Sequence, residues 1–147
     1  MQVNVAWIGK TKEPAIQALT SEYGARIQRY VDFQGLAFSS EAAFVKWVEK
    51  KAGRAAGALV LLDSRGKAMS SEELAEFVED HQTRNSLPLT FAIGPADGFS
   101  EDMHRRARRL LSLSRLTLPH ELARVVLLEQ IYRAFTIIKR HPYHVGH

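Results

Sequence analysis

Apolar positions along this chain follow two alternating patterns. Short continuous apolar runs, typical of buried strands, alternate with longer segments in which apolar residues recur every three or four positions, as on one face of a helix. The short runs predict strands at about 2–8, 35–38, 58–63, 89–93 and 110–114. The longer segments predict helices at about 13–31, 40–55, 70–84, 101–109 and 119–140. Strands that alternate with helices indicate an α/β fold with a mostly parallel sheet flanked by helices.

Local signals refine this pattern between residues 64 and 73. Ser64 to Lys67 is interpreted as a turn that ends the third strand. Ser70 and Glu73 have the spacing of a capping box and predict the start of the next helix. No repeat or long linker interrupts the 147 residues, so we expect a single domain over 1–147.

The last predicted helix changes its pattern along its length. In its second half an apolar stripe opposes a polar side. The stripe contains Leu127, Leu128, Ile131, Ala134, Phe135 and Ile138, and the polar side contains Glu129, Arg133, Thr136 and Arg140. In the first half, Leu122, Val125 and Val126 lie on the side that is polar further along. One face can therefore pack on its own domain, whereas the other needs a second partner.

His120 and Arg124 lie one turn apart in the sector of the apolar stripe. A guanidinium there needs an anionic or hydrogen-bonding partner. Two interpretations remain open. Either at least one of the two contacts a ligand or substrate, or Arg124 pairs with an acid of its own chain and His120 only occupies the helix start.

Composition excludes several kinds of chemistry. The chain has no cysteine, which excludes disulfides, thiolate zinc sites and cysteine nucleophiles. Its six histidines show no ligand spacing, so we expect no metal. No apolar run approaches the roughly 20 residues of a membrane helix. The first residues also lack the features of a secretion signal, and we expect a cytoplasmic protein with no membrane partner.

Positive charge is concentrated at the end of the chain. Residues 1–102 contain 11 Lys and Arg against 14 Asp and Glu, whereas residues 103–147 contain 9 against 2. Such a region attracts polyanions. We expect contacts with RNA phosphates from Arg105, Arg106, Arg109, Lys139 and Arg140. The alternative for the arginines near 105 is a solvated helix face.

Three loops follow predicted strands and would meet at one edge of a parallel sheet. They cover Leu62–Gly66, Gly94–Gly98 and Leu113–Leu118. Ligands of open α/β sheets bind beyond the carboxyl ends of the strands. The chain has neither a P-loop nor the G-x-G-x-x-G fingerprint, which disfavours a nucleotide-dependent enzyme acting on small molecules.

Several segments along the chain resemble a known family. They are Leu61–Lys67, Ile93–Gly94 with Asp97–Gly98, Leu113–His120, Arg124–Val125, Glu129–Ala134 and Pro142–His144. These segments resemble the RlmH family, which comprises ribosomal large-subunit pseudouridine methyltransferases of the SPOUT class. The similarity covers nearly the whole chain, and its C-terminal block is the most specific part.

The resemblance implies a fold, a cofactor and a reaction. The fold would be the SPOUT type of α/β fold with a C-terminal trefoil knot, assembled as a homodimer. S-adenosylmethionine would bind in the knot loops and methylate ring nitrogen N3 of a pseudouridine in 23S ribosomal RNA. The cofactor contacts implied by position are Leu62, Gly94, Leu113, Ser114, Arg115, Leu116, Thr117 and Leu118.

Four residues are candidates for the chemistry of that reaction. Arg124 and His144 are expected to hold the target base or its developing negative charge, and His120 to assist proton removal. Tyr143 is expected to stack on the target base or a neighbouring base. The tail that carries Tyr143 and His144 is expected to complete the pocket of a partner subunit, and the alternative is a disordered terminus.

One departure from the family pattern favours a second function. The chain has Gly94-Pro95 where the family usually has two consecutive glycines, and proline has no backbone N–H. The alternative function is a non-catalytic ribosome- or RNA-binding factor on the same fold. It predicts that the chain does not bind S-adenosylmethionine.

Overall fold

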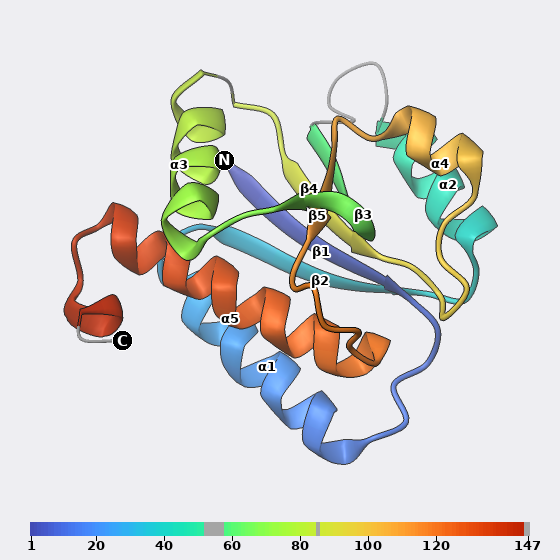
Figure 1. The fold of residues 1–147 in the computed structure, drawn as a ribbon, viewed down its shortest axis with the longest axis horizontal. Coiled ribbons are helices and arrows are strands. Elements are labelled where there is room, and N and C mark those ends of the chain that lie inside the picture. Colours follow the sequence, from blue (N-terminus) through green and yellow to red (C-terminus); the bar gives the residue numbers. More distant parts are fainter. Residues whose placement is uncertain (52–57, 85, 146–147) are drawn as a thin grey trace.

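A five-stranded sheet forms the centre of the molecule (Figure 1). The computed structural model describes residues 1–51, 58–84 and 86–145. Its strands are β1 (Gln2–Ile8), β2 (Asp32–Phe38), β3 (Ala58–Ala68), β4 (Leu89–Ile93) and β5 (Arg109–Ser112). They are arranged in the order β2-β1-β4-β3-β5, and every neighbouring pair is parallel. The prediction of a parallel α/β sheet is confirmed.

Helices cover both faces of this sheet. They are α1 (Pro14–Gln28), α2 (Glu41–Lys51), α3 (Ser71–Arg84), α4 (Glu101–Arg106) and α5 (His120–Ile138), followed by the short 3-10 helix η1 (Pro142–His144). Figure 1 shows α1, α3 and α5 on one face, with α2 and α4 on the other. The alternation of strands and helices in the sequence thus becomes a three-layer arrangement.

Each face of the sheet has its own apolar core, because successive strand residues point to opposite sides. In β1, Val5 packs in the core beneath α1, α3 and α5, whereas Ala6 packs in the core beneath α2 and α4. The first core also contains Leu127, Ile131 and Phe135 of α5. Helix α5 is therefore fixed on the sheet by its apolar stripe, with its first turn beside the ends of the strands.

The structure corrects the interpretation of residues 64–67 as a turn. Strand β3 continues through them to Ala68, and Lys67 pairs with Leu111 of β5 after a register shift that follows Leu62. Gly66 permits this pairing, since a Cβ at its position would lie 2.5 Å from the backbone carbon of Leu110. The side chains of residues 64–68 are mostly exposed, and this part of β3 pairs with β5 alone, so no buried apolar run marks it in the sequence.

The helix boundaries differ from the predictions mainly at the C-terminal ends. Helix α1 ends at Gln28 rather than at residue 31, because β2 begins at Asp32 and requires extended backbone. The capping box is confirmed: Ser70 N donates to Glu73 Oε1, and Glu73 N donates to Ser70 Oγ, both at 3.0 Å. The part of the second predicted helix that covers residues 52–55 lies outside the described residues.

Both predicted faces of α5 are present, with one correction. Thr136, expected on the polar side, is fully buried, and its hydroxyl donates to the carbonyl of Arg133 at 2.7 Å. That hydrogen bond removes most of the cost of burying the hydroxyl. On the second apolar face, Leu122 is half exposed, and Val125 and Val126 are partly exposed. The chain itself therefore leaves this face partly uncovered.

Candidate functional site

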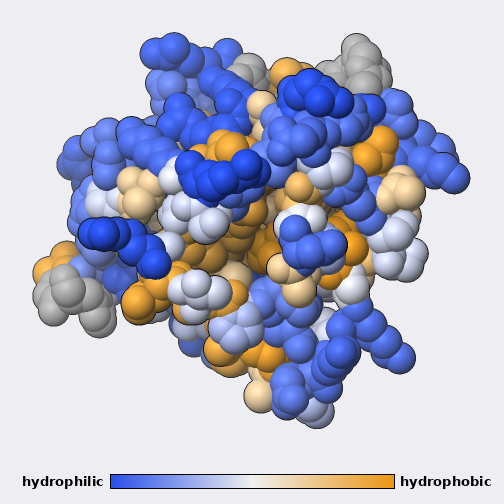
Figure 2. All heavy atoms as spheres, turned by 45° about the vertical axis from the view of Figure 1, so that its right-hand side comes forward, coloured by the Kyte–Doolittle hydropathy of each residue, from blue (hydrophilic) through white to orange (hydrophobic). Residues whose placement is uncertain are grey.

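The three predicted loops meet in one cleft of about 960 Å³. Its walls contain residues 62–66, 93–99 and 111–118, and it extends to His120 and Ala123 of α5. Figure 2, turned toward this side of the molecule, shows a hollow with hydrophobic residues on its floor. The expected cofactor residues all line this cleft: Leu62, Gly94, Leu113, Ser114, Arg115, Leu116, Thr117 and Leu118. The convergence of the loops is confirmed, whereas their contact with a cofactor stays a prediction.

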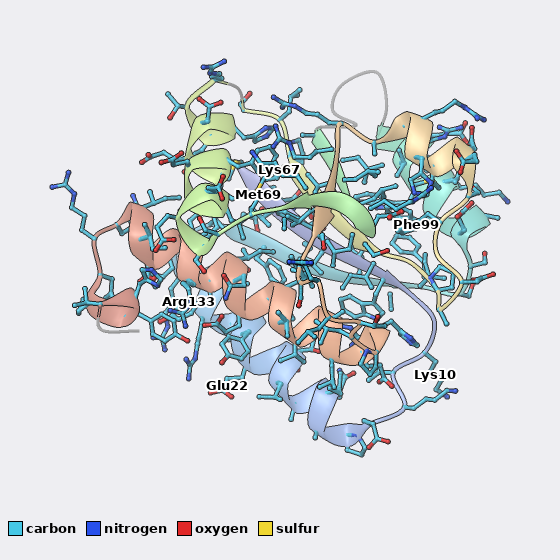
Figure 3. All side chains as sticks on the ribbon, in the orientation of Figure 1. Lys10, Glu22, Lys67, Met69, Phe99 and Arg133 are labelled. Atoms are coloured by element: carbon cyan, nitrogen blue, oxygen red, sulfur yellow. The ribbon has the colours of Figure 1, made fainter. Side chains whose placement is uncertain are left out.

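Gly94 allows its loop to fold back on Phe99. A Cβ at Gly94 would lie 3.0 Å from the Phe99 ring, which is buried beside α4 (Figure 3). Between them, Gly98 N donates to Pro95 O at 2.8 Å, and Gly98 has a φ of +84°. Pro95 thus contributes its carbonyl to a tight turn, a role that does not use a backbone N–H.

The loop from Leu113 to Leu118 is shaped by serine hydroxyls. Ser112 Oγ donates to the carbonyl of Ser114 at 3.0 Å, and Leu116 N donates to Ser114 Oγ at 2.9 Å. Leu116 is 77% exposed, and Arg115 and Thr117 are also exposed. These two hydrogen bonds fix the backbone of the loop, while the side chains at its tip point to solvent.

One polar cluster on the cleft wall was not predicted from the sequence. It consists of Asp63 and Arg65 on β3 and His104 on α4. Hydrogen bonds from Arg65 and His104 hold the pKa of Asp63 well below its usual range, although burial opposes this shift. The position of Asp63 directly after a buried apolar run is a signal in the sequence, but its pairing with a residue 41 positions away is not.

The structure places the four candidates for the chemistry in different parts of the molecule. His120 lies on the cleft, whereas Arg124 is 1% exposed in the core. Arg124 Nη1 donates to Thr11 Oγ1 at 2.9 Å, and its guanidinium carbon lies 4.1 Å from the centre of the Trp7 ring. Burial lowers the pKa of Arg124, while the charge of Glu121 raises it. Hydroxyl and aromatic partners thus take the place of the acid expected in one interpretation.

Tyr143 and His144 lie at the opposite end of α5. The helix has 19 residues, about 28 Å at 1.5 Å per residue, and after its end the chain folds back onto Glu129 and Arg133. Tyr143 Oη donates to Glu129 Oε2 at 2.8 Å, and His144 Nε2 lies 2.7 Å from Glu72 Oε1. Burial and Glu129 raise the pKa of Tyr143 to about 12. The tail is therefore held as η1 by its own chain and does not reach its own cleft.

Arg133 connects the residues that hold this tail. Its Nη2 donates to Glu129 Oε2 at 2.8 Å, and its Nη1 lies 2.9 Å from His144 Nδ1. The guanidinium carbon also lies 4.9 Å from the centre of the Tyr143 ring. Figure 3 shows Arg133 on the part of α5 that faces η1. We use the term tail network for Glu72, Glu129, Arg133, Tyr143 and His144.

The expected RNA-binding residues form two separate groups. Arg105 and Arg106 lie on α4 and pair with Asp102, at 3.5 and 2.9 Å. Arg109, at the start of β5, has its guanidinium carbon 4.8 Å from the centre of the Phe77 ring. Lys139 and Arg140 are exposed just after α5, on the other side of the molecule in Figure 1.

The described residues lack two kinds of feature. Residues 1–51, 58–84 and 86–145 contain no group of three or more His, Cys, Asp or Glu that could hold a metal ion. Within the same residues, no helix combines the length and the apolar character needed to cross a membrane.

Sequence comparison identifies the family. A family model described as "Predicted SPOUT methyltransferase" matches residues 1–144. The ribosomal RNA large subunit methyltransferase H of Koribacter versatilis is 53% identical over 147 residues, which is 100% of both chains. The protein of the same name from Citrifermentans bemidjiense is 43% identical over 98% of this chain and 99% of its own. This chain belongs to the RlmH family of SPOUT methyltransferases.

Solved structures of more distant SPOUT proteins and methylases show the same fold. A probable methylase family protein from Haemophilus influenzae superposes with a TM-score of 0.61 at 10% identity, over 98% of this chain and 69% of its own. The SpoU methyltransferase AviRb from Streptomyces viridochromogenes, in complex with AdoMet, gives 0.53 at 17% identity, over 88% and 56%. The SPOUT-type sheet is thereby confirmed, whereas the trefoil knot and the single domain over 1–147 stay predictions.

Proposed function

We propose that this chain transfers a methyl group from S-adenosylmethionine to ring nitrogen N3 of a pseudouridine in 23S ribosomal RNA. The observation that carries the proposal is the convergence of the three family-specific loops in one cleft. Relatives that align over the whole chain are named ribosomal RNA large subunit methyltransferase H. We place the enzyme in the cytoplasm because its substrate is ribosomal RNA.

The residues of the cleft fit the cofactor. A volume of about 960 Å³ lies within the range of sites that bind molecules of this size. The Gly94 loop and the 113–118 loop present backbone groups of fixed geometry, which suit a ligand with many hydrogen-bonding atoms. When bound, S-adenosylmethionine supplies an electrophilic methyl group on its sulfonium.

His120 is the proposed group for proton removal. The N3 imide of pseudouridine becomes nucleophilic when it loses its proton, so an acceptor near the base lowers the barrier. His120 lies on the cleft and is exposed at the start of α5. A neutral imidazole there would accept the N3 proton, which frees the N3 lone pair for the methyl group; the methyl–sulfur bond of the donor would break as the N–C bond forms, leaving a thioether.

Arg124 stabilises the first turns of α5, next to the cleft. Its hydrogen bond to Thr11 joins the segment after β1 to the first turns of α5, one turn from His120. At 1% exposure, direct contact with the base would require the guanidinium to leave Trp7 and Thr11. Its contacts therefore favour a positioning role, and the direct role expected from the sequence stays a prediction.

A second copy of the chain completes the site in this proposal. Tyr143 and His144 are held on Glu129 and Arg133 and do not line their own cleft, so in this proposal they reach the cleft of another copy. Leu122 and the partly exposed Val125 and Val126 form an apolar face of α5 that a second copy would cover. We propose a homodimer in which the tail network of one copy holds Tyr143 and His144 beside the cleft of the other.

A labelled-methyl assay tests the proposed function. The protein is incubated with methyl-labelled S-adenosylmethionine and either large ribosomal subunits or naked 23S RNA, and the modified base is located by mass spectrometry. We expect label at N3 of a pseudouridine. Label on another base would refute the specificity, and RNA binding without donor binding would favour the non-catalytic factor.

A further inference from the structure

Three side chains on the cleft wall have no part in the reaction proposed above. Asp63 and Arg65 project from β3 and His104 from α4, and all three line the cleft. His104 Nε2 lies 2.6 Å from Asp63 Oδ2, and the two side chains are 12% and 14% exposed. This short, mostly buried contact joins β3 to α4 across the wall of the cleft.

Arg65 holds Asp63 in its ionised form. Asp63 Oδ1 accepts hydrogen bonds from the backbone N of Arg65 at 2.8 Å and from its Nε at 3.2 Å. Asp63 Oδ2 accepts from Arg65 Nη2 at 3.1 Å. Because these contacts and His104 lower the pKa of Asp63, its carboxylate is a fixed negative charge near neutral pH.

Each ring nitrogen of His104 has an acceptor within hydrogen-bond distance, and Nε2 also lies near the Arg65 guanidinium, which can only donate. Nδ1 lies 2.8 Å from the carbonyl oxygen of Ser100, and Nε2 faces Asp63. Only the protonated imidazolium donates from both nitrogens at once. Asp63 and the Ser100 carbonyl raise the pKa of His104, whereas burial and the nearby Arg65 guanidinium lower it.

The charged groups around this pair come from three elements. Strand β3 contributes Asp63 and Arg65, and Arg65 Nη2 lies 2.8 Å from His104 Nε2. On α4, Glu101 interacts with Arg65. From α2, Glu41 accepts hydrogen bonds from Ser100 N at 2.9 Å and from Ser100 Oγ at 2.6 Å.

These contacts fix the far end of the Gly94 loop. The loop runs from Gly94 to Ser100, the residue that caps α4. Glu41 holds Ser100 from the side of α2, and His104 ties the same helix to Asp63, which directly follows Leu62. The His104–Asp63 contact therefore joins two of the three cleft walls.

We propose that His104 and Asp63 are a positioning pair that sets the distance between the Leu62 and Gly94 walls, so that binding of the methyl donor depends on protonated His104. The inference rests on the proposed function, because it takes the cleft as the donor site. His104 is placed as a positioning residue and takes no part in the transfer itself.

The pH dependence follows from the direction of the shift. A histidine whose pKa is raised in the folded protein makes its full contribution at low pH and loses it as pH rises through the folded value. Donor affinity should therefore fall as pH rises from about 6 to about 8.5, across the range in which histidine loses its charge.

Calorimetry and hydrogen exchange test the pair. Binding of S-adenosylmethionine is measured between pH 6 and 8.5 for the wild type, His104→Gln, His104→Lys and Asp63→Asn. The matched control is Asp80→Asn, which removes the same charge from an exposed ion pair with Arg84 on α3. Exchange of the amides of 94–100 is followed without donor, and thermal unfolding confirms that each variant folds.

At pH 6 we expect His104→Gln and Asp63→Asn to weaken donor binding roughly tenfold, the factor that one charge-assisted hydrogen bond supplies. His104→Gln should lose the pH dependence, and His104→Lys, charged throughout, should bind with little change across the range. Exchange at 94–100 should be faster in His104→Gln and unchanged in Asp80→Asn.

The positioning role of the pair would be refuted if His104→Gln bound the donor with wild-type affinity at pH 6. It would also be refuted if the wild type and His104→Gln showed the same pH dependence of donor affinity. Absence of donor binding by the wild type would instead refute the proposed function, and the exchange experiment distinguishes the two results because it uses no donor.

Discussion

The two ends of α5 are built in different ways. At its start, the cleft is framed by loops that are held by backbone and serine-hydroxyl hydrogen bonds and whose side chains at 115–117 are exposed. At its end, the tail network pairs Glu129 with Arg133 and Tyr143 within the same chain. The first end is suited to receive a ligand that brings its own hydrogen-bonding groups. The second is suited to present side chains in a fixed arrangement to another molecule.

The largest expected effect comes from filling the close approach at Gly94. The variant Gly94→Val places a side chain where a Cβ already lies 3.0 Å from the Phe99 ring, so the loop must move. Overpacking of this kind costs about 1–3 kcal/mol, and we expect donor affinity to fall up to roughly hundredfold in calorimetry. Gly24→Val is the matched control, because its Cβ would lie 3.2 Å from Phe33, away from the cleft. Equal loss in both variants would contradict a local role for Gly94.

The uncovered apolar face should be sensitive to charge. Leu122 is 49% exposed on α5, and in Leu122→Lys a second copy would bury an ammonium. We expect the dissociation constant of the dimer in sedimentation to rise at least tenfold, about 1.4 kcal/mol, with turnover falling in parallel. Leu87→Lys, at a position 38% exposed before β4, serves as the control and should leave the dimer intact. A monomeric wild type that is fully active would refute the dimer.

A smaller effect is expected for the tail network, where a substitution should lower turnover without changing donor binding in the cleft. Glu129→Gln removes the charge that Arg133 and Tyr143 contact, which loosens η1. We expect kcat to fall about tenfold, the value of one hydrogen bond to a charged group, with donor affinity unchanged. Glu22→Gln removes the same charge from an exposed pair with Arg26 on α1 (Figure 3) and should change neither quantity. If Glu129→Gln weakens donor binding instead, the two ends are not independent.

The smallest effect concerns RNA affinity. Arg106 on α4 already pairs with Asp102 and Glu49, whereas Lys139 lies beside the tail that presents Tyr143. We expect Lys139→Ala to weaken RNA binding and to reduce the slope of the logarithm of affinity against the logarithm of salt concentration by about one. Arg106→Ala should have less effect on both quantities. Filter binding at several salt concentrations measures both. A larger effect of Arg106→Ala would place the RNA on the α4 side.

Patterns that are local in sequence predicted the fold well. The alternation of strands and helices, the Ser70–Glu73 capping box and the second apolar face near Leu122 are all present. The strand at residues 64–68 was not predicted because this part of β3 pairs with β5 alone and is largely exposed, so it needs no apolar run. The burial of Thr136 was not predicted, because its hydroxyl donates to a carbonyl of its own helix and needs no water.

Contacts between distant segments were beyond the reach of the sequence pattern. Arg124 meets Thr11 across 113 positions, and Asp63 meets His104 across 41. Hydrophobic periodicity does not reveal such pairs, since they depend on the order of the strands in the sheet. The position of the cleft was predictable, because loops that follow parallel strands meet at one edge. The side chains that stabilise its walls were not.

Complementation between two inactive variants tests the central claim that the two ends of α5 act together across two copies. Gly94→Val impairs the cleft and keeps the tail, whereas Tyr143→Ala keeps the cleft and removes the tail ring. The two chains are co-expressed with different tags, purified as a mixed dimer and assayed for methyl transfer to ribosomal RNA. We expect each variant alone to be nearly inactive and the mixed dimer to recover one active site. A mixed dimer as inactive as either parent would contradict it.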